Sequence, residues 1–238
     1  MIVRRARTAP RRGSPGTVDE VGWHYLRAQE RVDVVLRTLD GEQWERSVCA
    51  CPGWRVRDVL AHLVGTPEDA IAGRLDGLPT PEQTDEQVER HRADDPVDLL
   101  DQWLAMGPIV ADAVTASGLW PAAIDAVTHE QDLRAAVDRP GARDVPSVDV
   151  IADLLGRLVE APVPVVFDLG DRQVESAVAE GTGAADPLVL HTTAFELLRL
   201  RLGRRSARQV AAMDWSASPD RVLTDLFVFG PAADDVIE

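Results

Sequence analysis

Apolar residues recur every three or four positions through much of the first 138 residues, which places them along one face of a helix. The pattern predicts four long helices, over residues 17–39, 54–65, 96–117 and 121–137. Thr17 is a candidate N-cap for the first helix, Gly118 ends the third, and Pro121 lies in the first turn of the fourth. Four long helices joined by connections are most simply packed as an antiparallel bundle.

The remaining segments lack this long helical periodicity. Residues 66–95 are polar and contain Gly and Pro, so they are expected to be helical only in part, and residues 139–146 combine turn formers and predict a linker. Beyond this linker, short strands are predicted over residues 164–169, 173–178 and 188–191. Helices are predicted over residues 148–158, from a cap at Thr192 or Thr193 to 202, near 207–213 and near 219–227.

These elements together predict an α+β fold in three parts. The basic residues at positions 1–16 are not followed by the apolar run of a secretory signal. These residues are expected to be a disordered arm, or to result from an upstream start codon. Residues 17–138 are expected to form the four-helix bundle, and residues 147–238 a small α+β C-terminal domain.

Composition narrows the class of partner. The formal net charge is -15, which repels phosphate backbones and anionic lipids, so neither nucleic acid nor a membrane surface is an expected partner. No apolar run approaches the roughly 20 residues that cross a bilayer. Cys49 and Cys51 are separated by one residue, too close for an ordinary disulfide, which favours a reducing, cytoplasmic location.

An unusual ridge of ionisable residues lies on the fourth predicted helix. Asp125, His129 and Asp132 stand at i, i+4 and i+7 and share one face, while the opposite face is supplied by Glu130, Gln131 and Arg134 and is expected to meet solvent. The ridge should therefore point inward, where an uncompensated carboxylate costs several kcal/mol. Either a local hydrogen bond between Asp125 and His129 or a bound metal ion would offset this cost.

The other histidines are weaker candidates when taken one at a time. His62 lies at the margin of the apolar face of the second helix, where it could be a packing residue or a metal ligand. His24 and His91 have polar neighbours and are expected to be solvated. His191 lies at a strand-to-helix junction, where a capping role is expected.

Taken together, several motifs resemble a known family. Residues 51–63 read CPGWRVRDVLAHL, Asp125 and His129 are followed by Asp132 and Leu133, and further matches are FELL at 195–198, LGRRS at 202–206 and FGP at 229–231. This combination resembles the maleylpyruvate isomerase family of mycothiol-dependent enzymes, which is related to the DinB-like helical bundles. The resemblance covers most of the chain after the N-terminal arm.

The resemblance implies a metal centre and a thiol cosubstrate. His62, Asp125 and His129 would hold a divalent metal, with zinc expected, although Asp125 stands where the isomerase has Glu and is one methylene shorter. The position left open would take the thiol of mycothiol, which would attack a small electrophile in an isomerase or S-transferase reaction. Neither Cys49 nor Cys51 lies in a motif that would make it the nucleophile.

Other residues are assigned expected roles around this centre. Asp132 is expected to lie behind the ligands or to face the substrate, and could orient His129 only by reaching around the helix. Arg204 and Arg205 could hold a substrate carboxylate, or could instead favour the helix C-terminus near Gly203. Trp54 is expected to pack in the core.

Two other classes of function compete with an enzyme. One is a non-catalytic module that keeps the metal and senses a ligand, for which the shorter Asp125 is the motive. The other is a bundle held by buried hydrogen bonds without metal. The sequence does not indicate an oligomeric state.

Overall fold

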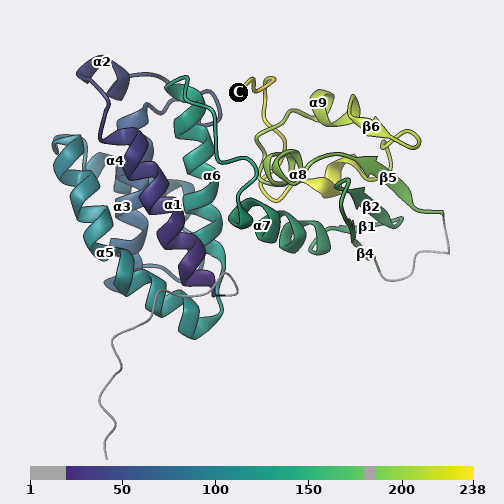
Figure 1. Ribbon diagram of the computed structural model, residues 1–238, viewed down its shortest axis with the longest axis horizontal. Coiled ribbons are helices and arrows are strands. Elements are labelled where there is room, and N and C mark those ends of the chain that lie inside the picture. Colours follow the sequence, from purple (N-terminus) through teal and green to yellow (C-terminus); the bar gives the residue numbers. More distant parts are fainter. Residues whose placement is uncertain (1–19, 180–185) are drawn as a thin grey trace, which may run out of the picture.

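A computed structural model describes residues 20–179 and 186–238 of the chain (Figure 1). The predicted arm over residues 1–16 and the predicted cap Thr17 lie outside the described residues. Within the described part, the fold is α+β as predicted: a helical bundle formed by the first half of the chain stands beside a smaller half that contains the strands (Figure 1). No helix in residues 20–179 and 186–238 is both long and apolar enough to cross a membrane.

The bundle is built from the four long helices that the apolar pattern predicted, and a fifth, shorter helix packs beside them. These are α1 (Val21–Leu36), α3 (Val56–Ile71), α4 (Pro81–Arg90), α5 (Pro96–Ser117) and α6 (Pro121–Ala136). Helix α1 packs against α5 and α6, and α3 packs against α4, α5 and α6. A single helical turn, α2 (Gly41–Trp44), precedes α3.

Helix α3 is longer than its sequence indicated. It was expected to end at Gly65, yet it continues to Ile71. Gly65 serves a close approach between helices, because a Cβ atom built there would lie 2.5 Å from the Cβ of Gln87 on α4. By contrast Gly118, with a φ of 68°, ends α5 as predicted.

The second half surrounds a small sheet with short helices. Its four strands follow the order β3-β2-β5-β6, with β2 and β5 parallel and the other two pairings antiparallel. These strands are β2 (Val165–Asp168), β3 (Gln173–Glu175), β5 (Leu188–His191) and β6 (Asp214–Trp215). The predicted strand over 173–178 divides in two, because β4 (Ala177–Val178) leaves this sheet and pairs with β1 (Glu160–Ala161).

Helices α7 and α8 pack against each other beside this sheet. Helix α7 spans Pro146–Arg157 and α8 spans Ala194–Arg201; a shorter helix, α9 (Ala207–Ala211), follows along the chain. Thr193 is the cap of α8, since its hydroxyl accepts from the amide of Glu196 at 3.1 Å. The helix predicted over 219–227 is reduced to one 3-10 turn, η1 (Leu223–Leu226).

Two predictions about exposure are wrong. Glu130 and Gln131 were placed on the solvent face of α6, but both are buried, because α1 and the chain after α6 cover that side. The Glu130 carboxylate instead accepts hydrogen bonds from Arg31 at 2.7 Å and Arg134 at 3.0 Å. Ion pairs within the bundle thus provide the hydrogen bonds to this carboxylate that water was expected to provide.

His24 and His91 are likewise buried instead of solvated. The Nδ1 atom of His24 lies 3.0 Å from the hydroxyl of Ser147, and His91 lies between the carboxylates of Glu68 and Asp94 at 3.0 and 2.8 Å. Hydrogen-bond partners that the fold brings close therefore allow these side chains to be buried. Only His191 of the three is exposed, where it faces Asp168.

Candidate metal centre

Three of the predicted residues meet between two helices of the bundle. His62 comes from α3, whereas Asp125 and His129 are one turn apart on α6, so their side chains stack on the same face. The Nε2 atoms of His62 and His129 lie 3.5 and 3.4 Å from the two oxygens of Asp125. One ligand atom from each residue falls within 4.8 Å of the others. Two imidazole nitrogens and one carboxylate are a donor set that suits a catalytic zinc ion.

The site opens at the carboxylate. Both imidazoles are buried, with side chains 8% and 7% exposed, whereas the side chain of Asp125 is 30% exposed. The indole of Trp54 lies over the two imidazoles, 5.3 Å from the ring of His62 and stacked at 6.4 Å on that of His129. Trp54 packs on the core as predicted and at the same time covers the two imidazoles, so a ligand would enter past Asp125.

The outer nitrogen of each imidazole also has a partner. His62 Nδ1 lies 3.0 Å from the amide oxygen of Gln87, and His129 Nδ1 lies 2.9 Å from a carboxylate oxygen of Asp132. Because both partners accept hydrogen bonds, each Nδ1 carries the hydrogen, and the Nε2 atoms face Asp125. This is the arrangement in which two neutral imidazoles present lone pairs to a metal.

The charges in the site favour a cation. Burial opposes ionisation of Asp125, but the imidazoles of His62 and His129 outweigh it and hold the pKa of this carboxyl well below its usual value. Burial also disfavours the charged form of His129, but the carboxylates of Asp125 and Asp132 raise its pKa well above the usual value. The pocket therefore stabilises positive charge, whether it arrives as a proton or as a metal ion.

Asp132 connects this centre to the second half of the chain. Its buried carboxylate pairs with Arg199 of α8 at 2.6 Å and with Arg204 at 3.0 Å, in addition to His129. The expectation that Asp132 would have to reach around the helix is wrong, because residues at i and i+3 are neighbours on its surface. Asp132 thus lies directly behind the imidazole of His129.

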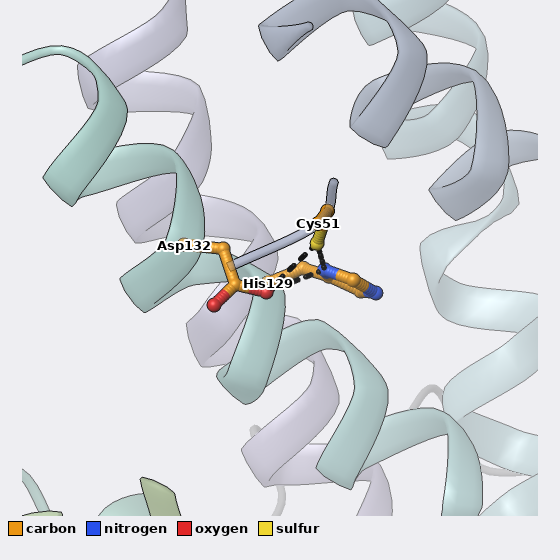
Figure 2. A group of neighbouring side chains, drawn as sticks. All are labelled: Cys51, His129 and Asp132. Carbon is orange, nitrogen blue, oxygen red and sulfur yellow. Dashed lines mark hydrogen bonds and ion pairs between the residues drawn. The ribbon is translucent and has the colours of Figure 1, made fainter. Parts of the chain in front are cut away.

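Sequence reasoning missed Cys51 as a neighbour of this centre. Figure 2 shows its sulfur beside His129 and Asp132: Sγ donates to Asp132 Oδ2 at 3.5 Å and lies 3.9 Å from His129 Nδ1. Arg204 Nη2 is 3.9 Å from the same sulfur. Only the fold reveals this proximity, because Cys51 lies in the loop before α3 and contacts α6. The arginines already neutralise Asp132, so this group is poorly suited to a second cation.

The two predicted arginines are engaged within the protein. Arg204 pairs with Asp132 and donates to the carbonyl of Leu202 at 2.7 Å, near the end of α8, as the alternative reading of these residues expected. Arg205 pairs with Glu196 and Glu238 at 2.8 and 3.0 Å. Arg204 therefore lies beside the Asp132–His129 pair, whereas Arg205 pairs with two other carboxylates. A role for either in holding a substrate stays a prediction.

Comparisons with known proteins bear on this centre. The profile of a family described as "Mycothiol maleylpyruvate isomerase N-terminal domain" matches residues 25–145, just over half of the 238 residues. The chain belongs to this family. The family resemblance inferred from the motifs is confirmed, and the matched residues include His62, Asp125, His129 and Asp132.

The solved structures extend the likeness in fold to the second half. One is a crystal structure of the mycothiol-dependent maleylpyruvate isomerase, at 15% identity, a TM-score of 0.50, and coverage of 84% of this chain and 93% of that one. A histidine-to-alanine mutant of that enzyme matches at 14% identity with the same TM-score and coverage. At these identities the likeness shows the fold alone. A comparison with curated protein sequences gives no match.

Proposed function

We propose that this chain is a metal-dependent enzyme that uses mycothiol as its thiol and isomerises, or attaches the thiol to, a small electrophile. The observation that carries the proposal is the convergence of His62, Asp125 and His129 on one point that is buried on the imidazole side and open at the carboxylate. The family to which the chain belongs, and the printed names of the two solved structures, support mycothiol as the thiol.

Each residue has a distinct part in holding the metal, for which zinc is the expected ion. His62 and His129 would each donate the Nε2 lone pair, and Asp125 would offset positive charge with an anionic oxygen. When bound, the ion would favour the anionic form of an added thiol. Asp132 keeps the imidazole of His129 in place, and Trp54 excludes water from the covered side of both rings.

The isomerisation needs no net electron or proton from the protein. A thiolate that adds to one carbon of a cis double bond leaves a single bond about which the adduct can rotate. Loss of the same thiolate then restores the double bond in the trans form and returns the thiol unchanged. A transferase would share the first attack but keep the new carbon–sulfur bond and release a leaving group. Isomerisation is the favoured outcome because both solved structures carry that name.

The proposal predicts about one divalent metal ion per purified chain and turnover of maleylpyruvate that requires the sulfur of mycothiol. Elemental analysis gives the metal content, and an assay with mycothiol against an analogue lacking the sulfur gives the thiol requirement. His191→Ala is the matched control, because His191 is exposed and pairs only with Asp168 at 3.2 Å among the described residues. A folded protein that cannot be loaded with zinc would refute the enzyme and the sensing alternative together, and would favour the metal-free bundle.

Substitutions at Asp125 should change the affinity for zinc according to the charge and length of the new side chain. Asp125→Asn removes the anionic oxygen between two imidazoles and is expected to weaken zinc binding about 10-fold or more, because a neutral oxygen offsets less of the ion's charge. Asp125→Glu keeps the charge and restores the longer side chain of the isomerase, so it should retain the wild-type affinity or improve it. Competition with a chromophoric chelator measures both. Equal affinities of the Asn variant and the wild type would remove Asp125 from the ligand set.

A further inference from the structure

A buried glutamine stands behind the metal-facing imidazole of His62. Gln87 comes from α4, a helix that is otherwise mostly polar, and its side chain is fully buried against α3. Its amide oxygen lies 3.0 Å from His62 Nδ1, and the hydroxyl of Thr66 donates to the same oxygen at 3.1 Å. Its amide nitrogen donates to Asp69 Oδ2 at 2.8 Å.

The chain of acceptors fixes which nitrogen of His62 carries the hydrogen. A carboxylate only accepts, so Asp69 requires the NH2 group of Gln87 to face it, and the amide oxygen must then face His62. That oxygen also only accepts, so the hydrogen of a neutral His62 is on Nδ1 and the lone pair on Nε2, toward Asp125. Asp69 is itself buried and held by Arg74 at 2.7 Å and Arg90 at 2.9 Å.

Gln87 comes within reach of His62 because the residue of α3 that faces it, Gly65, has no side chain. A Cβ atom at Gly65 would lie 2.5 Å from Gln87 Cβ and 3.2 Å from its Cα, closer than side-chain contacts allow. Helix α4 could not approach α3 at its present distance with any larger residue there. Gly65 therefore sets the spacing between α3 and α4, and Asp69 sets the orientation of the Gln87 amide.

We propose that Gln87, oriented by Asp69, is a positioning residue that holds His62 in the tautomer and ring orientation required for metal binding. The inference rests on the proposed metal site but concerns residues outside the three ligands. Partners of this kind change metal affinity by about 10- to 100-fold when they are removed. Gln87→Met, which keeps the length of the side chain and loses the amide, should weaken zinc binding by that factor.

Two readouts test the proposal. Chelator competition gives the zinc affinity, and nitrogen-15 NMR of the metal-free protein, at a pH where His62 is neutral, gives its tautomer. We expect Gln87→Met to shift His62 from the Nδ1–H form toward the Nε2–H form, which can donate to Asp125. Gly65→Ala, which displaces α4, should do the same. Gln131→Ala, a buried glutamine whose amide bonds to the carbonyl of Ala142 at 3.1 Å, should change neither readout.

A double variant separates positioning from simple damage to the fold. Asp69→Asn alone removes the group that orients the amide of Gln87 and should impair both readouts. In Gln87→Glu/Asp69→Asn the new carboxylate can accept from both His62 Nδ1–H and the new amide, so tautomer and affinity should return toward wild type. Wild-type zinc affinity and an unchanged tautomer in Gln87→Met would overturn the inference. If the wild type itself bound no zinc, the proposed function would fail, and the tautomer measurement would still decide the role of Gln87.

Discussion

Replacing Asp132 with alanine is expected to lower the free energy of unfolding by about 3 kcal/mol. Its carboxylate is buried and pairs with Arg199, Arg204 and His129, so the substitution leaves buried cationic groups without their main partner. Breaking a buried ion pair from one side costs about 3–5 kcal/mol. The lower end applies because Arg199 keeps a second carboxylate, that of Glu238, with a contact of 3.1 Å from its Nε. Urea denaturation measures the change.

A matched variant distinguishes burial from charge. Asp101 on α5 pairs with Arg37 at 2.7 Å, but 61% of its side chain is exposed, so Asp101→Ala should leave the stability essentially unchanged. Asp132→Asn keeps the shape of the side chain and removes only its charge, and it should be destabilised nearly as much as the alanine variant. An Asn variant as stable as the wild type would show that packing, and not charge, is what Asp132 contributes.

The pH dependence of this loss has a definite sign. Burial opposes ionisation of Asp132, but Arg204 and Arg199 outweigh it and hold its pKa well below the usual value. A lowered pKa stabilises the fold fully above the unfolded-state pKa of about 3.9, and this stabilisation disappears as the pH falls through the folded-state value. The stability difference between wild type and Asp132→Ala should therefore hold from neutral pH to about pH 5 and shrink only in stronger acid.

Proline and glycine predicted the ends of a helix correctly where they have no second role in tertiary packing. Helix α5 begins at Pro96 and ends before Gly118 as expected, because proline in the first turn and a left-handed glycine act within a few residues. Helix α3 continues past its predicted end because Gly65 does not terminate it but allows close packing against α4. The local sequence pattern contains no information about this contact. The same residue type thus ends one helix and permits the packing of another.

The candidate centre was predictable to the extent that it is local. Asp125 and His129 share a helix face, and the spacing alone placed them together, while His62 required the family resemblance because it comes from another helix. Gln87 and Cys51 could not be found this way. One lies on a polar helix and the other in a loop, and only the tertiary structure brings them to the outer nitrogens of the two imidazoles.

The position of Cys51 makes the source of the reactive sulfur the sharpest functional question. A protein thiol that lies 3.9 Å from an imidazole nitrogen and from an arginine could itself attack an electrophile. However, it lies beside Nδ1 of His129, whereas the Nε2 atom of that imidazole faces the partly exposed carboxylate of Asp125. The geometry therefore favours a thiol that enters from solution past Asp125, as in the proposed use of mycothiol.

The last prediction follows from this separation: His62→Ala should abolish both metal binding and turnover, whereas Cys49→Ser/Cys51→Ser should keep most of the turnover with mycothiol. Serine preserves a donor toward Asp132, so the network behind His129 survives, while His62→Ala removes one of the two imidazoles of the proposed metal site. Steady-state rates, metal content and circular dichroism are compared for the two variants. A double serine variant that keeps its fold and metal but has no activity would place the nucleophile in the protein and would disprove the role of mycothiol as the attacking thiol.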